Sequence, residues 1–260
     1  MCLILTFCLF GCAESDVSDV RTDEYEIIEY KEEEQNETRE EPQEEPPEEP
    51  AVKTYIKSMV NGLLVRSGPG KKYASVGSLD EGDMTAYCGT EGEWSRTYYR
   101  GKTAYVSARY TDLAEMTAAD ERTESVIALG EKYLGTPYVY GATRLHDGQG
   151  KMLRGFTDTE FDCSSYIQYI FYYGADVVLR ETTRTQVTQG VAVQKEELQR
   201  GDLIFMTNSS RKNLTGTERI GHVALYLGDN YILHTASDHA VIEKMTATRW
   251  NNYVMARRMI

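Results

Sequence analysis

Three side chains could together carry out nucleophilic chemistry: Cys163, His222 and His234. Cys163 stands where a polar loop gives way to an apolar segment that is predicted to be helical. A thiol at a helix N-terminus lies at the positive end of the macrodipole, which favours the thiolate. Each histidine stands at or near one end of an apolar, strand-like run. A cysteine followed by distant histidines is typical of thiol hydrolases.

The elements that must position these residues follow from hydrophobic periodicity and turn residues. Apolar positions predict a helix over 120–134, which Gly135-Thr136-Pro137 stops. A loop over 141–161 leads to the cysteine helix, which we expect to end near Gly174. A short helix is predicted over 182–189. The predicted strands after it cover 203–206, 223–227, 231–235, 241–244 and 254–259. Helices first and antiparallel strands after them favour an α+β arrangement.

An earlier region, residues 51–114, is rich in short predicted strands separated by turns. They cover 54–59, 63–66, 75–79, 84–88, 93–99 and 103–107. Even spacing of short strands is typical of a small all-β barrel. The segments 62–70 (GLLVRSGPG) and 101–107 (GKTAYVS) resemble a bacterial SH3-like domain. Modules of that family accompany cell-wall hydrolases and often bind wall peptides. We expect Trp94 to pack at the core edge.

Four ordered segments carry a second resemblance: 134–141 (LGTPYVYG), 161–165 (FDCSS), 201–205 (GDLIF), and 221–228 (GHVALYLG) with 232–236 (ILHTA). Residues 120–260 therefore resemble the NlpC-type cysteine peptidases of the cell wall, which have a papain-like fold. The resemblance implies an α+β catalytic domain behind the small SH3-like barrel. It also implies cleavage between γ-D-glutamate and a diamino acid in peptidoglycan stem peptides.

The residue types and the resemblance together suggest a role for each site residue. Cys163 is the expected nucleophile, His222 the expected base, and His234 the residue that orients His222. Tyr138 matches a family tyrosine near the oxyanion, where its hydroxyl could act beside the backbone N–H of Cys163. By resemblance, Asp162 and Ser164 hold polar substrate groups, including a free amine where one is required.

Two features depart from the family pattern. Ser165 stands where the family most often has glycine, and the 141–161 loop is longer than usual. Three basic residues in that loop, Arg144, Lys151 and Arg154, could meet substrate carboxylates, or the loop could simply be solvated.

Each functional role has a structural alternative. Cys163 could be an inert buried thiol. His222 or His234 could be a structural residue with its hydrogen bonds satisfied, and Tyr138 could serve only in packing. His146 and His239 lie in polar contexts, and we expect both to be solvated. Cys88 is expected to be a small buried hydrophobe. The sequence offers no closely spaced ligand pair near Cys163, so we expect no metal and no cofactor.

The acidity of the chain belongs to one segment. Of 260 residues, 41 are acidic and 28 basic, but residues 14–50 hold 17 acidic and 3 basic ones, so the rest is nearly neutral. The charge therefore says nothing about the substrate of the folded part, and no nucleic-acid partner is expected. Residues 13–50, also rich in proline, are predicted to form an extended, disordered linker.

Residues 1–12 form an apolar run that is too short to span a bilayer. The run is typical of a signal peptide, and residues 9–12 (LFGC) resemble a lipobox with Cys12 as the lipidated residue. A plain secretion signal is the alternative. We therefore expect an exported, lipid-anchored monomer that faces the cell wall and cleaves stem peptides or muropeptides. The alternatives are an idle wall-binding lipoprotein, or an amidase or acyltransferase on the same fold.

Overall fold

The computed structural model describes residues 51–236 and 238–260. The predicted signal peptide, lipidation site Cys12 and linker lie outside the described residues. No helix within the described ranges has the length and apolar character needed to cross a membrane.

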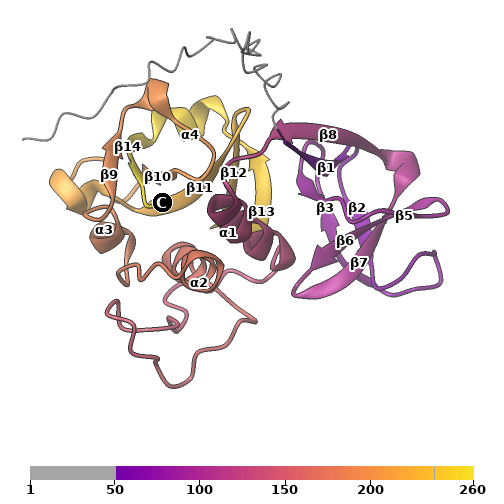
Figure 1. The fold of residues 1–260 in the computed structure, drawn as a ribbon, viewed down its shortest axis with the longest axis horizontal. Helices are drawn as coiled ribbons and strands as arrows, with labels where there is room; N and C mark the ends of the chain where they lie inside the picture. Colours follow the sequence, from indigo (N-terminus) through magenta and orange to yellow (C-terminus); the bar gives the residue numbers. More distant parts are fainter. Residues whose placement is uncertain (1–50, 237) are drawn as a thin grey trace, which may run out of the picture. The chain divides into compact units, whose positions relative to one another are not determined.

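Residues 52–117 form eight strands, coloured indigo to magenta in Figure 1. They are β1 (Val52–Ser58), β2 (Leu63–Arg66), β3 (Ser75–Leu79), β4 (Met84–Ala86), β5 (Thr90–Glu91), β6 (Trp94–Tyr99), β7 (Lys102–Ser107) and β8 (Thr111–Thr117). Five of them form an antiparallel sheet in the order β3-β2-β7-β6-β5. This is the expected strand-rich region, with apolar side chains such as Val65 and Val106 turned into its core.

The rest of the chain places helices before strands, so the predicted α+β class is confirmed. The helices are α1 (Glu121–Lys132), α2 (Cys163–Ala175), α3 (Thr183–Gln186) and α4 (Ala247–Asn251). The strands are β9 (Val191–Val193), β10 (Leu203–Met206), β11 (His222–Gly228), β12 (Tyr231–Ala236), β13 (His239–Lys244) and β14 (Tyr253–Arg258). They join β1, β4 and β8 in a nine-stranded sheet of order β8-β1-β4-β13-β12-β11-β10-β14-β9.

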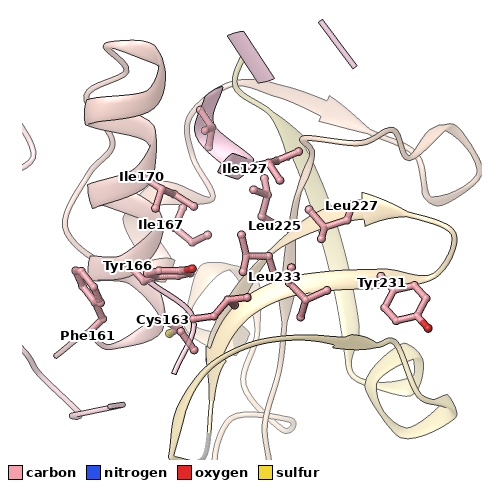
Figure 2. Packing of buried hydrophobic residues seen from close by; sticks show 14 of the residues in the cluster. Ile127, Phe161, Cys163, Tyr166, Ile167, Ile170, Leu225, Leu227, Tyr231 and Leu233 are labelled. Atoms are coloured by element: carbon pink, nitrogen blue, oxygen red, sulfur yellow. The ribbon is translucent and has the colours of Figure 1, made fainter. Parts of the chain in front are cut away.

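Helix α2 packs its apolar face on the middle of that sheet. Tyr166, Ile167 and Ile170 are fully buried and face Leu225 of β11 and Leu233 of β12, as Figure 2 shows. Burial of each such side chain stabilises the fold by about 1.5–3 kcal/mol. The packing fixes the N-terminus of α2 over the end of β11, where His222 begins the strand.

Helix α1 crosses α2 at a close backbone approach. A Cβ on Gly174 would lie 2.6 Å from the Cα of Val126, so only glycine fits there. The hydroxyl of Tyr166 donates to the carbonyl of Gly130 at 2.7 Å. These contacts set the axial position of α2, and with it the position of Cys163.

Candidate active site

Cys163 is the first residue of α2, and its neighbours close the helix end. Asp162 is the N-cap, and its Oδ1 accepts the N–H of Ser165 at 2.8 Å. In return, Ser165 Oγ accepts the N–H of Asp162 at 2.8 Å. This reciprocal capping box typically contributes about 1 kcal/mol and fixes the path of the chain into the helix. Ser165, the unusual residue in the motif, thus has a structural role that the sequence did not reveal.

Cys163 is buried, with 7% of the residue exposed. Burial raises its pKa to about 12, and the charge of Asp162 acts in the same direction. Backbone N–H groups of Val223, Ser164 and Cys163 itself work in the opposite direction by favouring the thiolate. The expected effect of the helix N-terminus is therefore present but outweighed by desolvation, and the resting thiol is neutral.

The two histidines lie on adjacent antiparallel strands and are hydrogen-bonded to each other. His222 Nε2 is 2.8 Å from His234 Nδ1, with the rings nearly perpendicular. Burial lowers the pKa of both, and in His222 the nearby His234 ring and the Arg249 charge disfavour protonation further. Both rings are therefore neutral at rest. The other nitrogen of His234, Nε2, lies 2.7 Å from Glu243 Oε1.

Tyr138 is held beside the entry to α2 by backbone hydrogen bonds. Its N–H donates to Asp238, and the residues on either side of it bond to Phe161. Upstream, Gly135 has φ +77°, and a Cβ there would collide with the ring of Tyr99, so a left-handed glycine starts this turn. Burial, followed by the charge of Cys163, raises the pKa of Tyr138 to about 12, so its hydroxyl is a proton donor.

Two adjoining hollows meet at these residues. One, of about 380 Å³, is lined by Cys163 together with Arg144, Arg184 and Arg211. The other, of about 430 Å³, is lined by His222, His234 and Arg249. Tyr138, Asn208 and Gly221 line both hollows. A substrate lying across that shared rim would meet the thiol on one side and the imidazole on the other.

Comparison with known proteins identifies the two regions. Residues 135–259 match the NlpC/P60 family, and residues 61–112 match the bacterial SH3 domain. The chain carries an NlpC/P60 domain behind a bacterial SH3 domain. Cys163, His222 and His234 all lie inside the NlpC/P60 domain, and so does Tyr138.

Curated relatives include the gamma-DL-glutamyl hydrolase of Bacillus subtilis, 32% identical over 149 residues. Another is the gamma-D-glutamyl-L-lysine dipeptidyl-peptidase of Bacillus cereus, 32% identical over 120 residues. The matches cover 56% and 46% of this chain but only 32% and 30% of those proteins. The chain thus spans about a third of the length of these relatives. A crystal structure of an NlpC/P60 protein from Bacillus cereus is 22% identical with a TM-score of 0.43, covering 79% of this chain and 63% of that one.

The predicted substrate contacts Asp162 and Ser164 lie beside Cys163, the expected nucleophile, in the NlpC/P60 domain. The second oxygen of Asp162 accepts Arg144 Nη2 at 3.0 Å, and Ser164 Oγ donates to the first oxygen at 2.9 Å. Arg144 also donates to the carbonyl of Glu181 at 2.5 Å. Arg144 is thereby fixed in the wall of the thiol pocket, whereas Lys151 and Arg154 of the same loop do not line it.

Other polar residues differ from the sequence-based expectation. His146, predicted to be solvated, is fully buried: its Nδ1 accepts the N–H of Gly148 at 3.1 Å, and its ring packs on Tyr172. The prediction was wrong because the long loop folds back onto α2. Cys88 is a free thiol and only half-buried. Among the described residues, no group of three or more His, Cys, Asp or Glu is arranged to hold a metal ion.

Proposed function

We propose that this chain is a cysteine peptidase that hydrolyses peptidoglycan stem peptides between γ-D-glutamate and the diamino acid. The observation that carries this proposal is the hydrogen-bonded histidine pair close to Cys163, which begins a capped helix. The gamma-glutamyl activities named for the relatives support the choice of bond.

The geometry of the site supports the following reaction. Cys163 Sγ attacks the carbonyl carbon of the scissile amide as His222 takes the thiol proton. The oxyanion accepts hydrogen bonds from the Cys163 backbone N–H and the Tyr138 hydroxyl. When the intermediate collapses, the C–N bond breaks and His222 returns its proton to the leaving amine. Water, deprotonated by His222, then hydrolyses the thioester and restores the thiol. His234 keeps the His222 ring aligned throughout.

The charge of the thiol pocket indicates which substrate groups it meets. Three arginines line the pocket, against the single carboxylate of Asp162, which already accepts from Arg144. Stem peptides carry free carboxylates close to the γ-glutamyl bond, and the pocket is suited to receive one of them. Asp162 and Ser164 would contact neighbouring polar groups. A free substrate amine would have to share Asp162 with Arg144.

The fate of Cys163 variants tests the activity. We expect the full chain with Cys163→Ala to release no cleaved stem peptide from muropeptides while it still sediments with insoluble peptidoglycan. Cys88→Ala is the matched control, because it removes the other thiol of the folded part and should keep full activity. Hydrolysis by Cys163→Ala at the wild-type rate would refute the proposal. Mass spectrometry of the products separates a peptidase from an amidase or acyltransferase on the same fold.

The SH3 domain and the lipid anchor complete the proposal. The SH3 domain would hold the enzyme on the wall, and lipidated Cys12 would tether it to the outer face of the membrane. In the alternative function, wall binding persists and no product forms even in the wild type. Globomycin-sensitive processing that is lost in Cys12→Ala tests the anchor, and a freely secreted wild type would overturn it.

A further inference from the structure

Glu243 contacts His234, the histidine that is hydrogen-bonded to His222. It belongs to β13, which pairs antiparallel with β12 so that Val241 stands opposite His234 and Glu243 opposite Ile232. Residues two apart on a strand share a face, so Glu243 lies diagonally next to His234. Its Oε1 is 2.7 Å from His234 Nε2, and the side chain is 26% exposed.

This contact determines where the protons lie along the pair. A carboxylate only accepts hydrogen bonds, so His234 Nε2 must carry a proton. Since His234 is neutral at rest, its Nδ1 carries none and is an acceptor. His222 Nε2, 2.8 Å away, must then donate to it. A neutral His222 with its proton on Nε2 has an unprotonated Nδ1. Of the two ring nitrogens, that one is free to take a proton from the thiol.

We propose that Glu243 is a positioning residue that sets the tautomers of His234 and His222 and stabilises the positive charge that the pair acquires when it takes the proton of Cys163. The role in catalysis rests on the proposed peptidase function, whereas the tautomers and the reactivity of Cys163 can be measured without a substrate. Nothing in the sequence singled out Glu243, because its partner lies on another strand.

Arg249 holds Glu243 in place. The Arg249 guanidinium, from α4, donates to the same carboxylate oxygen. Burial alone would raise the pKa of Glu243, but the hydrogen bonds from His234 and Arg249, together with the charge of Arg249, hold it below the usual value. The carboxyl of Asp83 also lies near Glu243. Glu243 is therefore ionised at neutral pH and available as the acceptor that the tautomer argument requires.

Nitrogen NMR of the full chain tests the tautomers without any substrate. The chain has four histidines, which can be labelled with ¹⁵N and assigned by single substitution. In the wild type we expect His234 to be protonated on Nε2 and His222 to be unprotonated on Nδ1. Glu243→Ala should shift a large part of His234 to the other tautomer. Glu243→Gln should keep the wild-type tautomer, because the amide oxygen can still accept.

The alkylation rate of Cys163 tests the consequence for the thiol. Iodoacetamide reacts with the thiolate, and mass spectrometry of the Cys163 peptide separates it from the other cysteines. At pH 7 we expect Glu243→Ala to slow alkylation between about tenfold and about a hundredfold, the loss typical of a charged hydrogen bond. Glu243→Gln should lie in between. Glu115→Ala, an exposed glutamate on β8, is the matched control and should leave the rate unchanged.

The outcomes separate this inference from the proposed function. A His234 tautomer that Glu243→Ala does not alter would overturn the inference. So would equal slowing by Ala and Gln, with unaltered tautomers, because it would indicate a purely structural role. If the tautomer and alkylation results hold but no stem peptide is cleaved, the positioning role stands and the proposed substrate is wrong.

Discussion

Ser165→Ala tests whether the capping box fixes the start of the helix that begins at Cys163. The variant removes the Oγ that accepts the N–H of Asp162 at 2.8 Å. Ser165 is fully buried, so water cannot replace that acceptor. An unsatisfied buried N–H costs about 1–3 kcal/mol. Asp162 Oδ1 still accepts the N–H of Ser165, so half of the box survives and the lower half of that range, about 1–2 kcal/mol, is expected.

Urea and thermal unfolding of the full chain measure this loss. A domain of 150–250 residues loses about 2–4 °C in Tm for each kcal/mol, so Ser165→Ala should melt about 2–8 °C below the wild type. Ser125→Ala is the matched control, since Ser125 Oγ bonds the carbonyl of Glu121 on an exposed face of α1. That control should change stability by less than about 0.5 kcal/mol. Equal stability of the two variants would refute the role assigned to Ser165.

Three further outcomes follow from the site. Tyr138→Phe removes the proposed oxyanion donor, and steady-state kinetics should show kcat reduced about a hundredfold or more with KM little changed; an unchanged kcat would exclude that role. Arg184→Met should raise KM for stem peptides with a free carboxylate but not for their amidated forms, and an equal effect on both would argue against a carboxylate subsite. Burial raises the pKa of Asp83 from 3.8 to about 6, so the native state loses stability as pH rises from about 4 to about 6, and the full loss is present above that range. The Tm of Asp83→Asn should therefore exceed that of the wild type at pH 7.5 but not at pH 4. The matched control Asp112→Asn, at an exposed position, should melt like the wild type at both pH values.

Most elements that position the site could be predicted because local signals were strong. The cysteine helix was expected to end near Gly174 and ends at Ala175, and strand 203–206 was predicted with its observed bounds. The strands β5, β8 and β9 were not predicted. The first and last have two and three residues, and β8 (Thr111–Thr117) is mostly exposed and lies at the edge of the described sheet, beside β1. Their existence depends on partner strands rather than on their own pattern.

The catalytic candidates were found because cysteine and histidine are rare and stand next to apolar runs. Their partners were not found, for two physical reasons. A capping box usually has Glu or Gln at its third position, so the Ser165 of this box gave no signal. Glu243 depends on the register between β12 and β13, which no local pattern specifies. The fully buried His146 was misjudged for the same kind of reason, since its burial comes from a long-range contact of its loop.

The SH3 and NlpC/P60 regions are joined by more than a linker within the described residues. Met84 of β4 pairs with Ile242 of β13, next to Glu243, so a strand of the SH3 region borders the strand that contacts His234. Arg200, in the NlpC/P60 region, donates to Tyr55 of β1 at 2.6 Å and to Glu124 of α1 at 2.5 Å. The ion pair between Arg200 and Glu124 is buried, so separating the two charges is costly. The pair therefore holds in place the guanidinium that contacts Tyr55. The SH3 region therefore supports the sheet edge behind the histidines, in addition to any role in binding the wall.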